Sequence, residues 1–205
     1  MAVYTKINKK DISYINKKFE IEKIISFKGI KQGIENTNYL LRSKNKKFIL
    51  TIFEKRVSQN EIPFFMKLMD QLNNSKINCP KPQKNKNGNY LVRIRKKSAC
   101  IVSFLEGKDK KLLNLKNCHE IGKMIAGMHL STKQINLSRK NSMGIKYLNP
   151  LLNSIKFKSK KFTNIEKFLK INFKDIKMKW PKKLPSGIIH GDLFIDNIIF
   201  KKDKL

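Results

Sequence analysis

The sequence has few of the features that mark linkers, membrane spans or disulfide scaffolds. Its 205 residues include nine glycines and six prolines and no long Gly/Ser or Pro tract, so a disordered linker is not expected to dominate. No run of about 18 apolar residues occurs, and the N-terminus lacks the apolar core of a secretory signal. The three cysteines, Cys79, Cys100 and Cys118, are odd in number and lack metal-ligand spacing. We therefore expect ordinary thiols in a cytoplasmic protein that has no membrane partner.

Acidic residues are also scarce: 15 Asp and Glu stand against 46 Lys and Arg, which gives a formal net charge of +31. Such an excess raises nucleic acid as a partner. However, the lysines are spread along the whole chain instead of forming one basic arm, and aromatic residues are not interleaved with them as in a base-stacking surface. We predict no specific nucleic-acid binding, and keep a basic nucleic-acid-binding protein as the alternative from another class.

The pattern of apolar residues changes character about halfway along the chain. In the first half it predicts strands at 21–27, 37–42, 48–53, 90–94 and 99–105, and helices at 10–19 and 61–72. In the second half it predicts helices at 117–130, 147–155 and 164–176, then short strands at 187–189 and 198–200. This order predicts an α+β protein with two lobes, at 1–105 and 106–205, joined by a hinge near 103–107.

The polar loop between the last two predicted strands carries the clearest chemistry. It reads His190-Gly191-Asp192-Leu193-Phe194-Ile195-Asp196-Asn197. Phosphoryl transfer from ATP needs a carboxylate to orient the acceptor hydroxyl and an amide oxygen to hold Mg²⁺, and Asp-x-x-x-x-Asn supplies both. Asp192 and His190 are the predicted catalytic residues, with His190 bracing the loop, and Asn197 is the predicted metal ligand. The alternative is that Asp and Asn are only turn formers.

This loop resembles that of the aminoglycoside phosphotransferase-like kinases, and along nearly its whole length the chain resembles the homoserine kinases of that group. The resemblance rests on residues 1–5 (MAVYT), 28–30 (KGI), 33–41 (GIENTNYLL), 48–56 (FILTIFEKR), 63–65 (PFF), 79–82 (CPKP), 104–107 (FLEG), 139–141 (RKN), 180–181 (WP) and 190–197. It implies a protein-kinase-like two-lobe fold, with an antiparallel sheet in the N-lobe and a mainly helical C-lobe. It also implies ATP and Mg²⁺ as cofactors, and L-homoserine as the small-molecule partner.

The turn near the start of the predicted sheet is expected to lie over the ATP phosphates. By the resemblance, Gly33, Asn36 and Asn38 are the predicted nucleotide-binding residues: Gly33 allows close approach of the backbone, and the asparagines add amide groups. An ordinary hairpin turn is the alternative.

Kinases of this fold often carry a lysine on the third strand that pairs with the phosphates and with a glutamate of the next helix. That position falls on Thr51, which has no charge. Lys55 or Arg56 are candidates for the missing cation, and Glu61 is a candidate for the helix carboxylate.

The fold continues, by the resemblance, with a further strand that bears a second Mg²⁺-binding Asp. The sequence ends at Leu205, before such a residue. We therefore expect these 205 residues to be a fragment, incomplete at the C-terminus, that does not transfer phosphate by itself. Choline, ethanolamine and aminoglycoside kinases share the loop and remain alternatives for the acceptor, and a non-catalytic pseudokinase remnant remains another.

Overall fold

The computed structural model describes residues 3–31, 35–54, 58–141, 144–155, 163–181 and 183–201. The chain divides into two compact units. One unit combines Met1–Leu137 with Gly187–Leu205, and the other is Ser138–Ser186. The predicted lobe boundary between 105 and 106 stays a prediction.

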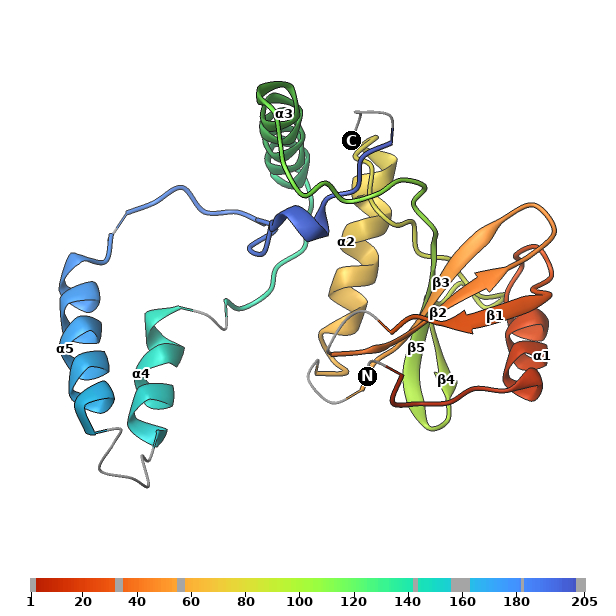
Figure 1. Cartoon of the computed structure of the whole chain (residues 1–205), viewed down its shortest axis with the longest axis horizontal. Helices are drawn as coiled ribbons and strands as arrows, with labels where there is room; N and C mark the ends of the chain where they lie inside the picture. Colours follow the sequence, from red (N-terminus) through yellow and green to blue (C-terminus); the bar gives the residue numbers. More distant parts are fainter. Residues whose placement is uncertain are drawn as a thin grey trace. The chain divides into compact units, whose positions relative to one another are not determined.

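A five-stranded antiparallel sheet forms the centre of the first unit (Figure 1). Its strands are β1 (Ser26–Gly29), β2 (Thr37–Arg42), β3 (Lys47–Ile52), β4 (Leu91–Ile94) and β5 (Lys97–Ser103), in the order β1-β2-β3-β5-β4. The predicted α+β class with an antiparallel sheet is confirmed. Because the predicted strand 48–53 pairs with both 37–42 and 99–105, the central strand of the sheet is β3.

The first strand begins five residues later than expected. The prediction placed it at 21–27, but β1 starts at Ser26. The side chain of Asn16 accepts a hydrogen bond from the Ile24 N–H at 2.8 Å and donates one to the Ile24 carbonyl at 3.0 Å. Since both backbone groups of Ile24 are bonded to this side chain, they do not pair with β2, and the ladder begins after them.

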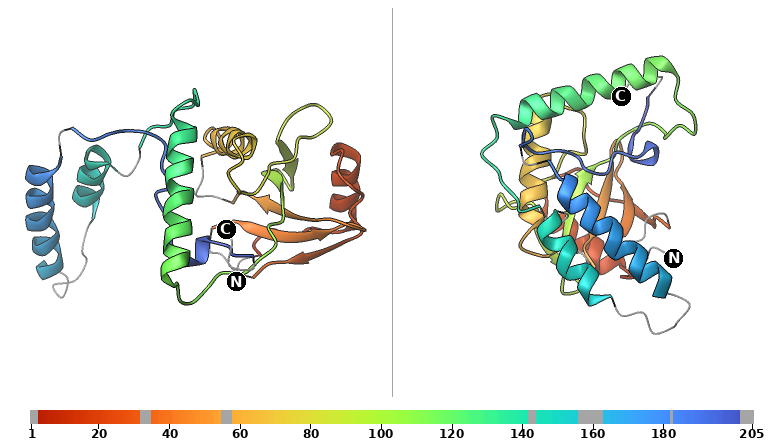
Figure 2. Two further views of the ribbon diagram at one scale, coloured as in Figure 1. Left: turned by 90° about the horizontal axis from the view of Figure 1, so that it is seen from above. Right: turned by 90° about the vertical axis from the view of Figure 1, so that its left-hand side faces the viewer.

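The alternation of side chains along the strands gives the sheet two buried faces. On one face Leu41, Leu50 and Ile101 pack with the helix α1 (Lys9–Lys18). On the other face Cys100 and Val102 pack with the helix α2 (Ile62–Asn74). Figure 2 shows the two helices beside the sheet. Each fully buried Leu or Ile contributes about 1.5–3 kcal/mol by removal from water, so the sheet is stabilised from both sides.

The remaining helices follow the sheet in the sequence. They are α3 (Leu115–Thr132), α4 (Ile145–Ser154) and α5 (Thr163–Lys179), all three close to the predicted helices. The helix α3 belongs to the first unit, whereas α4 and α5 belong to Ser138–Ser186. No helix among the described residues is long and apolar enough to cross a membrane.

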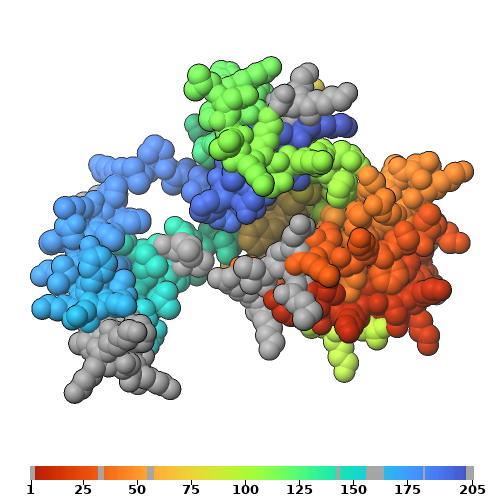
Figure 3. Space-filling model, viewed as in Figure 1, coloured from red at the N-terminus to blue at the C-terminus, as the bar shows by residue number. Residues whose placement is uncertain are grey.

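The short strands predicted at 187–189 and 198–200 are not observed: residues 187–189 are irregular, and Phe200 forms only an isolated bridge, with Lys108. Phe200 donates to the Lys108 carbonyl at 2.9 Å and accepts from the Lys108 N–H at 3.0 Å. Both backbone groups of Phe200 are therefore paired with the segment that follows the sheet, and not with residues 187–189. Figures 1 and 3 show this C-terminal segment, in dark blue, beside the green segment that leads to α3.

Gly107 allows this close approach. Its φ of +149° lies in a region that side chains rarely adopt, and a Cβ there would lie 2.6 Å from the Phe200 carbonyl oxygen. The side chains of Ile198 and Phe200 are buried, at 5% and 4% exposure. The segment that carries the loop is therefore packed into the first unit.

Candidate active site

The loop at 190–197 is shaped by a left-handed glycine and a short turn. Gly191 has φ +76°, and no atom would lie within 4 Å of a Cβ built on it, so its backbone conformation alone favours glycine. The Phe194 N–H donates to the Asp192 carbonyl at 3.0 Å, and a single 3₁₀ turn, η2 (Ile195–Asn197), follows. This turn returns Asn197 to Asp192.

The two predicted functional side chains of the loop are in contact. The Asn197 amide nitrogen Nδ2 donates to the Asp192 carbonyl at 2.8 Å and to the Asp192 carboxylate oxygen Oδ2 at 3.3 Å. Both residues are exposed to solvent. The structure therefore brings the predicted catalytic carboxylate and the predicted metal ligand together, and it leaves them accessible to a substrate.

These hydrogen bonds also orient the amide. Since Nδ2 is held by Asp192, the amide oxygen Oδ1 of Asn197 is turned away from this contact and is free to accept from another group. Oxygen is the ligand that Mg²⁺ prefers, and Mg²⁺ is usually held by one or two protein oxygens plus substrate phosphates. Asn197 fits that role. No group of three or more His, Cys, Asp or Glu that could hold a metal occurs among the described residues.

His190 is exposed at the start of the loop. Within the described ranges its side chain makes none of the hydrogen bonds that hold the loop, which come from Asn197 and from the backbone. Its predicted bracing role stays a prediction.

Asn36 and Asn38, two of the three predicted nucleotide-binding residues, lie at the start of β2. Gly33, like the candidate cations Lys55 and Arg56, is outside the described residues. Asn36 accepts from the Glu54 N–H at 3.3 Å through Oδ1, and Asn38 accepts from the Thr51 hydroxyl at 2.8 Å. In both cases the amide oxygen is bonded within the sheet, which orients the amide NH₂ groups.

The threonine that replaces the usual third-strand lysine therefore has a structural partner. Asn38 and Thr51 are register partners in the β2–β3 ladder, so the hydroxyl and the amide meet across the strands. Both point to the face of the sheet opposite to Tyr39, Leu50 and α1, because neighbouring residues of a strand alternate between faces. This is the face that α2 covers.

Sequence reasoning missed a half-buried ion pair at the same end of the sheet. Glu54 follows β3, Lys97 begins β5, and their side chains form a salt bridge. The Glu54 side chain is 9% exposed. The two residues are 43 positions apart, so only the pairing of β3 with β5 brings them together. No local pattern in the sequence predicts it.

The pKa of Glu54 is set by opposing effects. Burial raises the pKa of the carboxyl, but hydrogen bonds from Lys97, Thr37 and Thr5 outweigh it and hold the pKa below its usual value. Glu54 is therefore a charged, hydrogen-bonded carboxylate at neutral pH.

Cys79 and Cys100 behave as structural thiols. All three are free, and burial raises the pKa of Cys79 to about 11 and that of Cys100 to about 12. Since the thiolate is the reactive form, neither of these two thiols is activated.

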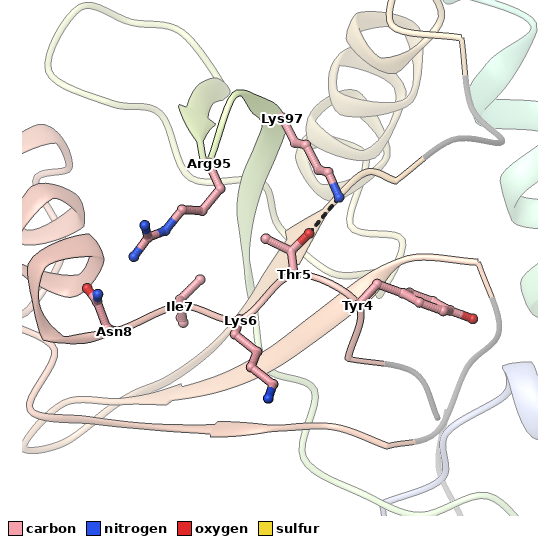
Figure 4. Close-up of a pocket in the computed structure, with 7 residues that line it drawn as sticks. All are labelled: Tyr4, Thr5, Lys6, Ile7, Asn8, Arg95 and Lys97. Atoms are coloured by element: carbon pink, nitrogen blue, oxygen red, sulfur yellow. Dashed lines mark hydrogen bonds between the residues drawn. The ribbon is translucent and has the colours of Figure 1, made fainter.

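A shallow pocket of about 490 Å³ lies where the N-terminal segment crosses the β4–β5 turn (Figure 4). Its walls include Tyr4, Lys6, Arg95 and Lys97. Two of its cations are already paired, Arg95 with Asp11 at 2.9 Å and Lys97 with Glu54. None of the predicted site residues lines it.

The fold has close counterparts among solved structures. A spectinomycin phosphotransferase in complex with ADP and spectinomycin superimposes with a TM-score of 0.64 at 13% sequence identity, over 97% of this chain and 67% of that one. A microcompartment-associated aminopropanol kinase gives a TM-score of 0.67 at 15% identity, over 92% of this chain and 63% of that one. The sheet and the loop at 190–197 thus belong to the fold of small-molecule phosphotransferases.

The chain belongs to the phosphotransferase enzyme family, which its residues 26–205 match. It is 35% identical over its whole length to the homoserine kinase of Nitrobacter winogradskyi, and 36% identical to that of Paramagnetospirillum magneticum. In each case it spans 63% of the relative's own length.

Proposed function

We propose that this chain is the nucleotide-binding and catalytic-loop part of a homoserine kinase, which transfers the γ-phosphoryl group of ATP to the hydroxyl of L-homoserine. The observation that carries the proposal is the contact of the exposed Asp192 carboxylate with the Asn197 amide on a loop held by a left-handed glycine. The homoserine kinases that match the whole chain at 35–36% identity support the acceptor.

Asp192 would accept a hydrogen bond from the homoserine hydroxyl and take its proton as the oxygen attacks the phosphorus of the γ-phosphate. The hydrogen bond from Asn197 Nδ2 to Oδ2 restrains the carboxylate, so it offers its other oxygen in one orientation. No covalent phospho-enzyme is needed, because the acceptor can attack directly in line. Asn197 would hold Mg²⁺ through Oδ1, and the metal would neutralise charge on the phosphates.

The nucleotide would lie on the sheet. We assign residues 1–105 to its binding, with Gly33, Asn36 and Asn38 toward the phosphates, and residues 106–205 to the catalytic loop. The NH₂ groups of Asn36 and Asn38 are oriented by the bonds that their oxygens make in the sheet, so they are suited to donate to phosphate oxygens.

The identity of the acceptor distinguishes this proposal from the other small-molecule kinase activities of the same fold. The spectinomycin phosphotransferase and the aminopropanol kinase share the fold at 13–15% identity, which supports phosphoryl transfer to an alcohol but not one acceptor over another. Homoserine carries a carboxylate as well as an amine, so a panel of acceptors discriminates sharply.

The test is a phosphorylation assay of the gene extended to its natural stop codon, with ATP and Mg²⁺ and with homoserine, choline, ethanolamine, spectinomycin and kanamycin in parallel. We expect turnover of homoserine alone. Asp192→Ala should abolish it, whereas Asp196→Ala, which changes the neighbouring exposed carboxylate of the loop, should not. A folded protein that turns over another acceptor, or none, would overturn the proposal.

A further inference from the structure

A partly buried polar network joins four segments at the end of the sheet where β2 begins. The Glu54 carboxylate accepts from the hydroxyl of Thr37 at 2.6 Å and from that of Thr5 at 2.7 Å, and it pairs with Lys97. Lys97 also donates to the Thr5 hydroxyl at 2.7 Å, as Figure 4 shows. Thr37 is fully buried and Thr5 is 7% exposed. Each oxygen or nitrogen of the network thus has a partner, as buried polar groups require.

The network continues into the N-terminal segment. The Thr37 hydroxyl oxygen accepts from the Tyr4 N–H at 2.9 Å and from the Thr5 N–H at 3.1 Å. The Thr37 hydroxyl therefore connects the N-terminal segment, β2 and the Glu54 carboxylate that follows β3. Loss of the carboxylate would leave buried donors unpaired, which costs more than the bond itself contributes.

Glu54 also holds Asn36, the residue before Thr37. The Glu54 backbone N–H donates to Asn36 Oδ1 at 3.3 Å, while the Glu54 carboxylate accepts from Thr37. Two neighbouring residues at the start of β2 are thus fixed by one residue. Asn36 is the predicted phosphate-facing amide, and its NH₂ orientation depends on this bond to Oδ1.

A second carboxylate provides a natural comparison at the other end of β2. Glu22 accepts from the Ser43 hydroxyl, the Asn45 N–H and the Asn45 side chain, each at 3.0 Å. It holds the turn between β2 and β3, at the end of these strands away from Asn36 and Thr37. Glu22 and Glu54 are therefore two carboxylates with similar hydrogen-bonding roles at opposite ends of one strand pair.

We propose that Glu54 is a positioning residue for nucleotide binding: it fixes Asn36 and Thr37 at the start of β2, and thereby the amide that Asn36 offers to a phosphate. The inference rests on the proposed function, because it names the residue that sets the geometry of that site. Glu54 itself does not touch the nucleotide, since its carboxylate oxygens face Thr5, Thr37 and Lys97.

The test compares Glu54→Gln with Glu22→Gln in the 205-residue chain. Affinity for ATP with Mg²⁺ is measured by calorimetric titration, and exchange of the Glu54 and Thr37 amide hydrogens is measured by NMR without nucleotide. Glu54→Gln keeps the backbone N–H that bonds Asn36, but it removes the ion pair with Lys97 and the negative charge to which Thr5 and Thr37 donate, so the start of β2 should be held less firmly. We expect about tenfold weaker ATP binding, with faster exchange at Glu54. Glu22→Gln should lower the melting temperature but leave ATP affinity and the exchange of Glu54 unchanged.

Thr5→Val serves as the milder variant if Glu54→Gln does not fold. It removes the 2.7 Å donor to the carboxylate and the acceptor of Lys97 while keeping the shape of the side chain, so a smaller loss of ATP affinity is expected. Wild-type affinity in a folded Glu54→Gln or Thr5→Val protein would overturn the inference, as would an equal loss in Glu22→Gln. A wild-type chain without ATP affinity would instead refute the nucleotide site itself, and the exchange rates would still show whether Glu54 fixes Asn36.

Discussion

The sheet and the Ser138–Ser186 unit bury their own apolar side chains to very different extents. In the sheet, Leu41, Leu50, Ile52 and Ile101 are fully buried. In the helices α4 and α5 seven large apolar side chains remain exposed: Tyr147 47%, Leu151 59%, Ile165 44%, Phe168 64%, Ile171 59%, Ile176 46% and Met178 69%. The two regions therefore differ in what each has to pack against.

The comparison shows that only the sheet has both of its apolar faces covered by other elements of its own unit. The strands of the sheet have α1 on one face and α2 on the other. The helices α4 and α5 contact each other, and α5 adds the surface ion pairs Glu166–Lys170 and Asp175–Lys179, each worth about 0.3–0.5 kcal/mol. Because a helix is stabilised mainly by burying its apolar face, we expect α4 and α5 to contribute little to the stability of this chain.

Two leucines test this comparison most strongly. Leu50 is fully buried and Leu151 is 59% exposed. Leu50→Ala should lower the free energy of unfolding by about 2–5 kcal/mol, since it leaves a cavity between β3 and its neighbours. The matched Leu151→Ala should stay within about 0.5 kcal/mol of wild type. Urea unfolding followed by circular dichroism measures both, and equal losses would show that α4 is packed as tightly as the sheet.

Gly107 tests how firmly the catalytic-loop segment is held to the sheet unit. In Gly107→Ala the new Cβ would lie 2.5 Å from the Ile199 side chain and 2.6 Å from the Phe200 carbonyl. The clash and the φ of +149° should together cost about 1–3 kcal/mol and weaken the Lys108–Phe200 bridge.

The control for this variant is Gly88→Ala. Gly88 also has a positive φ, +78°, but no atom lies within 4 Å of its Cβ position. It should therefore cost only the backbone strain, about 1 kcal/mol. Amide exchange at Phe200 separates the two: it should become faster in Gly107→Ala and remain unchanged in Gly88→Ala. Unchanged exchange in both variants would mean that the bridge does not hold the segment.

The sequence predicted correctly those features that are set by neighbouring residues along the chain. Alternating apolar residues predicted β2 as 37–42, as observed, because one face of the strand is buried. The loop at 190–197 was predicted to present Asp192 and Asn197 to one site, and the structure brings the two side chains together.

The predictions that failed depend on distant partners. Two short apolar runs predicted strands at 187–189 and 198–200, but only an isolated bridge forms there, between Phe200 and Lys108, 92 residues earlier in the chain. The Asn16 side chain displaced the start of β1, and the Glu54–Lys97 pair joins the ends of two strands. A sequence pattern indicates on which face of a strand a side chain lies. These contacts can be predicted only when it is known which segments lie next to one another in the fold.

The smallest expected effect concerns the polar end of the sheet and its dependence on pH. The pKa of Glu54 is lowered in the folded protein from its ordinary value of 4.5, so the folded state binds fewer protons there than the unfolded state does. Its stabilising contribution is therefore fully present above about pH 4.5 and is lost as the pH falls through the lower folded pKa. Urea midpoints measured from pH 7 down to about pH 3 should fall more steeply for wild type than for Glu54→Gln, which has no proton to gain at this site. Parallel curves would show that Thr5, Thr37 and Lys97 hold the neutral carboxyl as well as they hold the carboxylate, and the end of the sheet at Asn36 would then be fixed by shape and not by charge.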